Sequence, residues 1–243
     1  MSNLQNVQRK LATGTTSWLN FEFNCDRGDL LSEKALAVPV GQILNSIPNT
    51  NERIKAEVEH PYLIRANGPI RKKPQVDFAI VEKNDKNPKK KDPKNDKWII
   101  VVETKWIGKT IIGLEQIVWD LIRLELLVFE TGCKAFFILS GFHKKMDSAI
   151  GNTHFYSGEK SSKTLITKQN KRISLELLNL NTGQKSAINE KLIKYNLKTP
   201  EIMEFNIPHF SPGKDEIKTN LSFETIVWEV LTNKKTKRIS KII

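Results

Sequence analysis

Three short apolar runs, rich in β-branched and aromatic residues, lie in the middle of the chain. They cover residues 74–81, 98–106 and 134–141, and their length and composition predict buried β-strands. The second run changes character at its end, where Glu103 and Lys105 replace apolar residues. We therefore expect a central sheet in which one strand ends in charged side chains.

A longer apolar run at residues 111–130 predicts a helix that ends at the cap signal Thr131-Gly132. Because it is apolar on nearly every side, we expect it to be buried between other elements. Charged residues such as Asp120 interrupt the run and would be costly in a bilayer, which favours a core helix over a membrane span. The strand after this crossover helix should lie parallel to a neighbour.

Weaker patterns precede these elements. Residues 29–38 predict a helix that Asp29 or Ser32 could cap and that Pro39 should end or kink. Residues 58–65 predict a strand, and a proline within it indicates an edge position.

Two polar segments connect the first three strands. A turn signal at residues 67–69, Asn-Gly-Pro, predicts a hairpin between the first strand and the second. Residues 83–97 contain no apolar residue and two prolines, so we expect an exposed loop between the second strand and the third.

The pattern loosens beyond residue 150. Residues 164–168 and 173–180 suggest a hairpin, residues 186–195 and 223–231 suggest helices, and the tail is basic. No internal repeat or linker is evident, so we expect one domain over residues 1–243.

The order helix, strand, strand, strand, helix, strand (αβββαβ) indicates an α/β protein with a central mixed sheet flanked by helices. Its core would cover about residues 29–141, and residues 150–243 would form a C-terminal extension.

The charge balance and the cysteine count indicate which kind of partner and which cellular compartment to expect. The formal net charge is +12, which suggests a polyanionic partner, nucleic acid first and an anionic membrane surface second; a general bias toward Lys and Asn could also supply much of it. Two cysteines suggest a reducing compartment, and the first residues lack a signal-peptide pattern. We expect a cytoplasmic protein without a membrane partner.

One group of charged residues suggests a catalytic site. Glu103 and Lys105 are two residues apart on a strand, so their side chains share a face. If that strand pairs with residues 74–81, Asp77 can meet them. Two carboxylates and an ammonium at one sheet edge suit Mg²⁺, a water and a phosphate; the alternative is a buried salt-bridge cluster, which is costly to bury.

An Asp on one strand, followed by Glu-x-Lys at the end of the next, resembles the motif of the PD-(D/E)XK nucleases. That superfamily includes type II restriction endonucleases, junction resolvases and repair nucleases. The resemblance covers about residues 29–141 and implies a restriction-endonuclease-like core. Two features depart from the family pattern: Val76 stands where a proline is expected, and a polar loop lengthens the gap from Asp77 to Glu103.

The resemblance implies roles for individual residues. Asp77 and Glu103 would bind Mg²⁺ together with the backbone carbonyl of Thr104, and Lys105 would orient the water or stabilise the transition state. Glu33, on the preceding helix, would be a fourth catalytic residue that binds a second metal or its water if that helix packs against the sheet edge; the alternative is a solvated surface glutamate.

One subset with exonuclease activity has Gln-x-x-x-Tyr on the following helix. Here Asp120 occupies the tyrosine position after Gln116, which leaves Gln116 as a secondary candidate. Gln116, Asp120 and Arg123 form one polar stripe on that helix.

These features together predict a Mg²⁺-dependent endonuclease that hydrolyses double-stranded DNA, of the type II restriction kind. The C-terminal extension would serve DNA recognition or dimerisation, and a homodimer would suit cleavage of both strands. The alternatives are a repair or junction-resolving nuclease of the same fold and a basic nucleic-acid-binding protein without catalysis.

Overall fold

The structure is a computed structural model of the 243-residue chain. It describes residues 6–63, 74–82, 97–108, 112–142, 144–146, 172–176, 181–197, 202–206 and 223–232. The helical elements are α1 (Val7–Asn24), the short 3₁₀ turn η2 (Gly28–Leu30), α2 (Glu33–Asn45), α3 (Leu114–Thr131) and α5 (Thr182–Lys194). The strands are β1 (Glu52–Glu59), β2 (Gln75–Glu82), β3 (Trp98–Ile107), β4 (Lys134–Phe142), β5 (Arg172–Glu176), β6 (Ile202–Asn206) and β7 (Phe223–Leu231).

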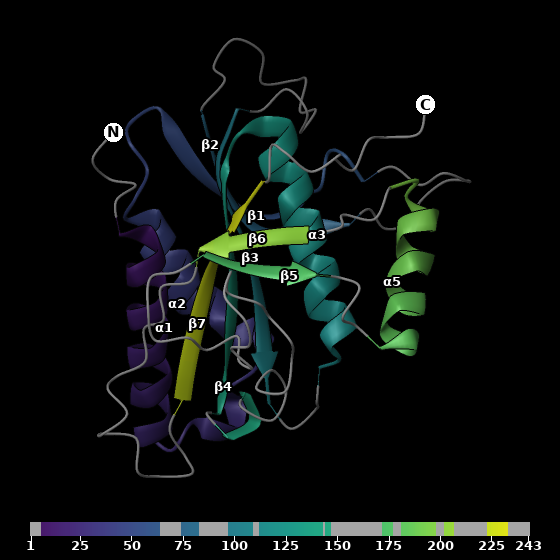
Figure 1. The fold of residues 1–243 in the computed structure, drawn as a ribbon. Coiled ribbons are helices and arrows are strands. Elements are labelled where there is room, and N and C mark those ends of the chain that lie inside the picture. The colour runs from purple at the N-terminus through teal and green to yellow at the C-terminus, as the bar shows by residue number, and fades with distance from the viewer. Residues whose placement is uncertain are drawn as a thin grey trace.

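A single mixed sheet runs through the molecule in the order β1-β2-β3-β4-β7-β6-β5 (Figure 1). β3 and β4 are parallel, and every other neighbouring pair is antiparallel. The five strands β1, β2, β3, β4 and β7 pack against helices, which confirms the α/β class and the mixed sheet. The parallel β3–β4 pair follows from the crossover through α3, as the sequence predicts.

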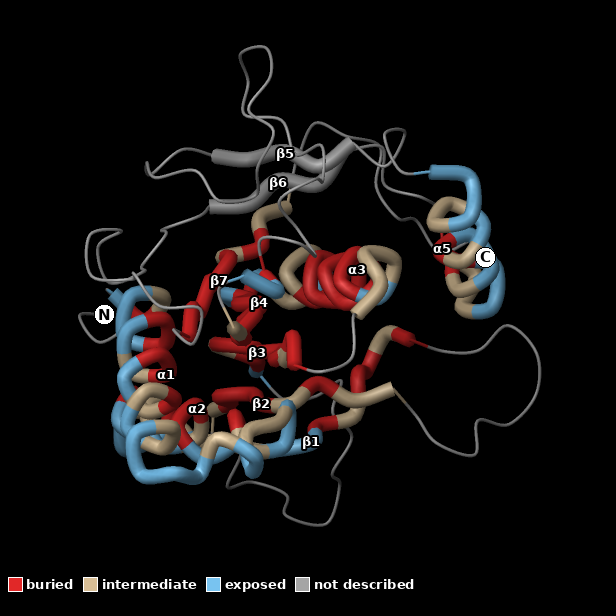
Figure 2. Tube along the Cα trace, turned by 90° about the horizontal axis from the view of Figure 1, so that it is seen from below, coloured by how far each residue is buried: buried red, intermediate tan, exposed pale blue. Residues whose placement is uncertain are grey.

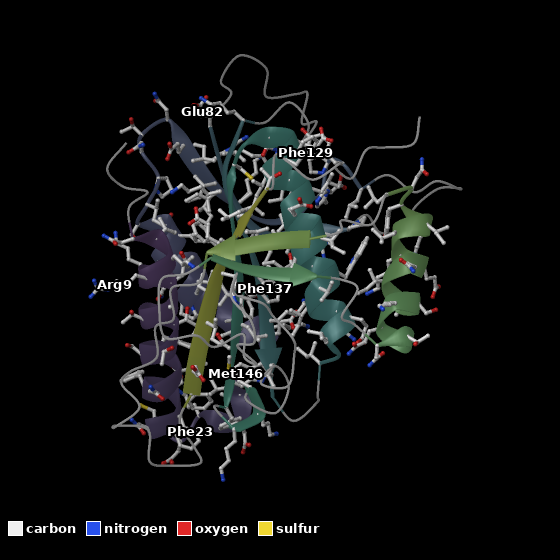
Figure 3. The ribbon with its side chains drawn as sticks, in the orientation of Figure 1. Arg9, Phe23, Glu82, Phe129, Phe137 and Met146 are labelled. Carbon is white, nitrogen blue, oxygen red and sulfur yellow. The ribbon has the colours of Figure 1, made fainter. Side chains whose placement is uncertain are left out.

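Helices cover both faces of the sheet (Figure 2). Side chains alternate along β4: Phe136 packs with Leu11 of α1 and Val40 of α2, whereas Phe137 packs on the other face with α3. Phe137, which Figure 3 labels in the middle of the molecule, also stacks on Trp228 of β7, with ring centroids 5.3 Å apart. An apolar core therefore lies on each face of the sheet, and both cores pack against the strands that carry the candidate site.

The helix α3 ends as predicted. Gly132 takes the left-handed conformation, φ 70°, and its amide donates to the carbonyl of Val128. This geometry suits glycine because it has no Cβ to clash. The predicted helix at residues 186–195 is also confirmed, as α5.

The helix α2 differs from the prediction at Pro39. Residues 33–45 form one helix with Pro39 inside it, so the predicted end at that residue is wrong. Proline removes one backbone donor, but burial of Leu36, Val40 and Leu44 outweighs that loss. Ser32 is the cap, since its hydroxyl accepts from the Ala35 amide at 3.3 Å.

Residues 223–231 form a strand, β7, and the prediction of a helix there is wrong. The segment is buried along most of its length between β4 and β6, so it lacks the alternation that marks a half-buried strand. Its β-branched and aromatic composition is the signal that favours a strand. The C-terminal extension thus contributes a central strand to the sheet.

Two N-terminal elements also differ from the sequence prediction. Helix α1 was not predicted, although Val7, Leu11 and Leu19 recur at helical spacing and are buried. The edge strand is β1 at Glu52–Glu59, which begins before the predicted residues 58–65. Most of its residues are charged, so the sequence lacks the apolar pattern that predicts a strand.

Several predicted segments lie outside the described residues: the turn at residues 67–69, the loop at 83–96, the strand at 164–168 and the basic tail. β5 pairs with β6 rather than with any other described strand. Within the part of the chain that the structure describes, no helix is long and apolar enough to cross a membrane.

Candidate active site

The β2–β3 ladder ends at the pair Phe78–Val102, whereas β3 continues beside β4 as far as Ile107. Asp77 and Glu103 are the next residues on the two strands beyond that last pair. Where the ladder ends, both the amide and the hydroxyl of Thr104 donate to Oδ2 of Asp77, at 2.7 and 2.6 Å. The Asp77 carboxylate thus replaces a strand partner and is fixed at the opening between the strands.

Lys105 gathers carboxylates from three elements. Its Nζ lies 3.0 Å from Oε1 of Glu33 on α2, 3.5 Å from Oδ2 of Asp120 on α3 and 3.7 Å from Oε1 of Glu103 on its own strand. Helices that cover opposite faces of the sheet therefore meet at this ammonium, which leaves only 16% of the Lys105 side chain exposed.

Arg123 of α3 is the second cation, and it is buried. Its Nη1 donates to Oδ1 of Asp120 at 2.6 Å. Its Nη2 lies 3.4 Å from Oε2 of Glu103 and donates to the carbonyl of Gln75 at the start of β2. The guanidinium thus joins α3 to both site strands, while its buried Nε has no hydrogen-bond partner in the part of the chain that the structure describes.

His60 stabilises the turn of α3 that carries Arg123. Its Nε2 donates to the carbonyl of Arg123 at 3.0 Å, and its Nδ1 accepts from the Tyr62 amide at 3.3 Å. Burial lowers the pKa of His60 to about 3. The ring is therefore neutral, with both nitrogens satisfied.

The charged side chains around Lys105 and Arg123 form what we call the charge cluster. Four carboxylates face two cations, an excess of two negative charges when all are ionised (4 − 2 = 2). Glu33 is about half exposed to water, but the excess of the other three carboxylates over the two cations is unfavourable to bury unless a further cation compensates it. The members of the charge cluster are Glu33, Asp77, Glu103, Lys105, Asp120 and Arg123.

Ionisation of Glu103 is unfavourable in the metal-free fold. It is 4% exposed, and burial raises its pKa to about 8; the charges of Asp120 and Asp77 also raise it, while Arg123 and Lys105 oppose the rise. A cation bound at Glu103 would relieve the cost of ionising it.

Both cations remain charged. Burial opposes the charge on Lys105, but Asp120, Glu103 and Glu33 outweigh it and raise the pKa of the ammonium. Burial likewise opposes the charge on Arg123, and Glu103 and Asp120 raise its pKa. Neither residue can serve as a base near neutral pH.

The predicted site residues can now be located. Glu103, Lys105 and Glu33 are in direct ion-pair contact, and Asp77 joins them through Thr104 and through its charge. Gln116 is exposed, and among the described residues no hydrogen bond or ion pair joins its side chain to the cluster. The role of the Thr104 carbonyl stays a prediction.

Sequence reasoning assigned no role to Asp120 or Arg123. The signal was present as the polar stripe on α3, because charged residues three apart on a buried helix need partners. Which partners they have depends on how α3 packs across β3, and the sequence does not reveal that packing.

The donor set fits a hard divalent cation in an open site. Among the described residues, Asp77 accepts its hydrogen bonds through Oδ2, and Glu103 lies 3.4 Å from Arg123 and 3.7 Å from Lys105. Mg²⁺ is commonly bound by one or two carboxylates and completes its shell with water and substrate phosphate. Among the described residues, no three His, Cys, Asp or Glu side chains lie together as a group that could hold a metal ion.

Comparisons with protein-family models, with curated proteins and with solved structures gave no match for this chain.

Proposed function

We propose that this protein is a Mg²⁺-dependent endonuclease that hydrolyses phosphodiester bonds of double-stranded DNA, of the restriction type. The observation that carries the proposal is Glu103, a buried carboxylate with a raised pKa beside Asp77 at the end of the β2–β3 ladder. A purely structural ion cluster gains nothing from a buried carboxylate whose ionisation is unfavourable.

The acidic and the basic residues of the site would have different roles. Asp77 and Glu103 would hold the cation, with the Thr104 carbonyl as a further ligand on the family pattern. Bound there, Mg²⁺ would lower the pKa of a water and offset the charge that develops on the phosphate. Lys105 remains protonated, so it would act as a cation beside the phosphate or orient the water. Glu33 holds the Lys105 ammonium at 3.0 Å.

The surroundings of the cluster support an anionic substrate. Helix α5 packs on α3 through Ile188 and Leu192. Its last turn carries Lys191 and Lys194, and burial lowers the pKa of Lys191 while Asp120 and Glu115 oppose that shift. A basic helix therefore flanks the acidic site, which suits a DNA backbone whose phosphates need neutralising on either side of the metal.

Two rivals remain in view. A repair or junction-resolving nuclease would use the same residues on a different DNA structure. A basic DNA-binding protein without catalysis would keep the charge cluster as a purely structural feature, and the close ion pairs of Lys105 with Glu33 and of Arg123 with Asp120 favour that reading. A twofold dimer that cuts both strands is part of the proposal.

Digestion of a defined plasmid tests the proposal. Mg²⁺ should permit cleavage and EDTA should abolish it, and Asp77→Ala, Glu103→Ala and Lys105→Ala should each lose activity while keeping a cooperative thermal transition. Sequencing of the product ends distinguishes the classes: ends at one fixed sequence indicate restriction, and ends at branches or lesions indicate repair. Near-normal cleavage by any two variants would end the assignment.

A further inference from the structure

Asp120 occupies a position in the charge cluster that the nuclease resemblance does not assign. It is 5% exposed and lies on the largely buried helix α3. Its two oxygens contact different cations: Oδ1 accepts from Arg123 Nη1 at 2.6 Å, and Oδ2 lies 3.5 Å from Lys105 Nζ. One carboxylate on α3 thus bridges both positive charges of the site.

The distances within the cluster are uneven. Arg123 is 2.6 Å from Asp120 but 3.4 Å from Glu103, and Lys105 is closer to Glu33 and to Asp120 than to Glu103. Each cation therefore has its shortest contact with a carboxylate other than Glu103. Glu103 receives the longest carboxylate contact of each cation, 3.7 Å from Lys105 and 3.4 Å from Arg123.

We propose that Asp120 is a positioning residue that holds Arg123 off Glu103 and anchors Lys105 beside it, so that Glu103 stays open to a divalent cation. This inference rests on the proposed function, since it concerns the same site. Without the charge of Asp120, the closest remaining carboxylate for Arg123 is Glu103, already within reach of Nη2. A charge-assisted guanidinium–carboxylate pair would then compete directly with the metal.

The geometry makes the direction of each substitution predictable. Asp120→Asn keeps the shape of the side chain and removes its charge, so Arg123 should close on Glu103 and Mg²⁺ affinity should fall about tenfold or more, as for changes just outside metal ligands. Asp120→Glu keeps the charge, so it should retain most of the affinity. If Asp120 serves only packing, the isosteric Asn should be the milder change.

A second substitution checks the route through Arg123. Adding Arg123→Gln to Asp120→Asn removes the competing cation, and Mg²⁺ affinity should recover to within a few-fold of wild type. The matched control is Glu130→Gln, an exposed carboxylate near the end of the same helix, which should change nothing.

The experiment is calorimetric titration of Mg²⁺ into each full-length variant at fixed pH and salt, with plasmid cleavage measured in parallel. Reduced affinity in Asp120→Asn with recovery in the double variant supports the inference. If the double variant does not fold, the order Asp120→Glu tighter than Asp120→Asn supports it, and the reverse order overturns it. Wild-type affinity in Asp120→Asn overturns the inference alone, while a wild type that neither binds Mg²⁺ nor cleaves DNA overturns the proposed function and the inference with it.

Discussion

Thr104 donates both its amide and its hydroxyl to a single oxygen of Asp77, at 2.7 and 2.6 Å. This pair of bonds lies immediately beyond the last β2–β3 ladder pair. It fixes the Asp77 carboxylate, whose other oxygen, Oδ1, accepts no bond in these two contacts. The residue between Glu103 and Lys105, which varies freely in the motif, is therefore a structural part of this site.

Replacement of Thr104 by valine removes the hydroxyl and keeps the amide bond and the side-chain shape. We expect a loss of about 1.5–3 kcal/mol in unfolding free energy, typical of a hydrogen bond to a charged group, and lower cleavage because Asp77 is less well fixed. Urea unfolding and plasmid cleavage measure the two effects.

Thr225→Val is the matched control for that change. The Thr225 hydroxyl is also buried and bonds Ser140 at 2.9 Å between β4 and β7, outside the charge cluster. It should lower stability without a specific loss of cleavage. Equal loss of cleavage in the two variants at matched stability would contradict the role given to Thr104.

The raised pKa of Glu103 makes the stability of the metal-free protein depend on pH. The folded carboxyl titrates near 8, against an ordinary value of 4.5, so the folded state holds this proton more tightly than the unfolded state does. The resulting stabilisation is present below about pH 4.5 and is lost as the pH rises toward 8, at up to about 1.4 kcal/mol per unit.

Glu103→Gln isolates this effect because it cannot titrate. In EDTA, the stability of the wild type relative to Glu103→Gln should fall between pH 5 and pH 8, measured by urea unfolding. Mg²⁺ at pH 8 should restore the wild type and not the variant. A difference that stays constant across this range would show that Glu103 is ionised throughout.

His60 should act in the opposite direction. Its pKa is about 3 in the fold against an ordinary value of 6.5, so the unfolded chain takes up the proton first. Stability from the neutral ring is present above about pH 6.5 and is lost as the pH falls toward 3. We expect the wild type to lose up to about 1.4 kcal/mol per pH unit relative to His60→Gln between pH 6.5 and pH 5.

Urea unfolding of both proteins at pH 7, 6 and 5 measures that difference, and titrating groups elsewhere cancel in the comparison. Parallel pH profiles would contradict the buried, neutral state of His60. Because His60 bonds the Arg123 carbonyl, its protonation would also disturb the helix turn that carries Arg123.

The sequence predicted the central elements because their signals are local. The apolar runs of β2, β3 and β4 and the cap at Gly132 determine strand and helix without help from distant residues. The meeting of Glu103 with Lys105 follows from the period of a strand, and their link to Asp77 follows from the pairing of two adjacent strands.

What the sequence left open depends on packing between distant segments. Residues 223–231 have no alternation because β4 and β6 flank them, and Pro39 stays helical because its neighbours are buried against the sheet. Asp120 belongs to the charge cluster only because α3 crosses β3 at Lys105. No local pattern encodes that contact.

The most direct test of the proposed nuclease site measures how DNA affinity depends on the metal and on the site residues. DNA affinity is measured at fixed salt for the wild type, Asp77→Asn and Lys105→Ala, each in EDTA and in Ca²⁺, a hard cation that can support binding without turnover. The wild type should bind much more tightly in Ca²⁺ than in EDTA, because empty carboxylates repel the phosphate. Asp77→Asn should depend less on the metal, and Lys105→Ala should bind slightly more weakly because an attractive charge is lost. Identical affinities in all six conditions would contradict a metal-dependent nuclease site at Asp77 and Glu103.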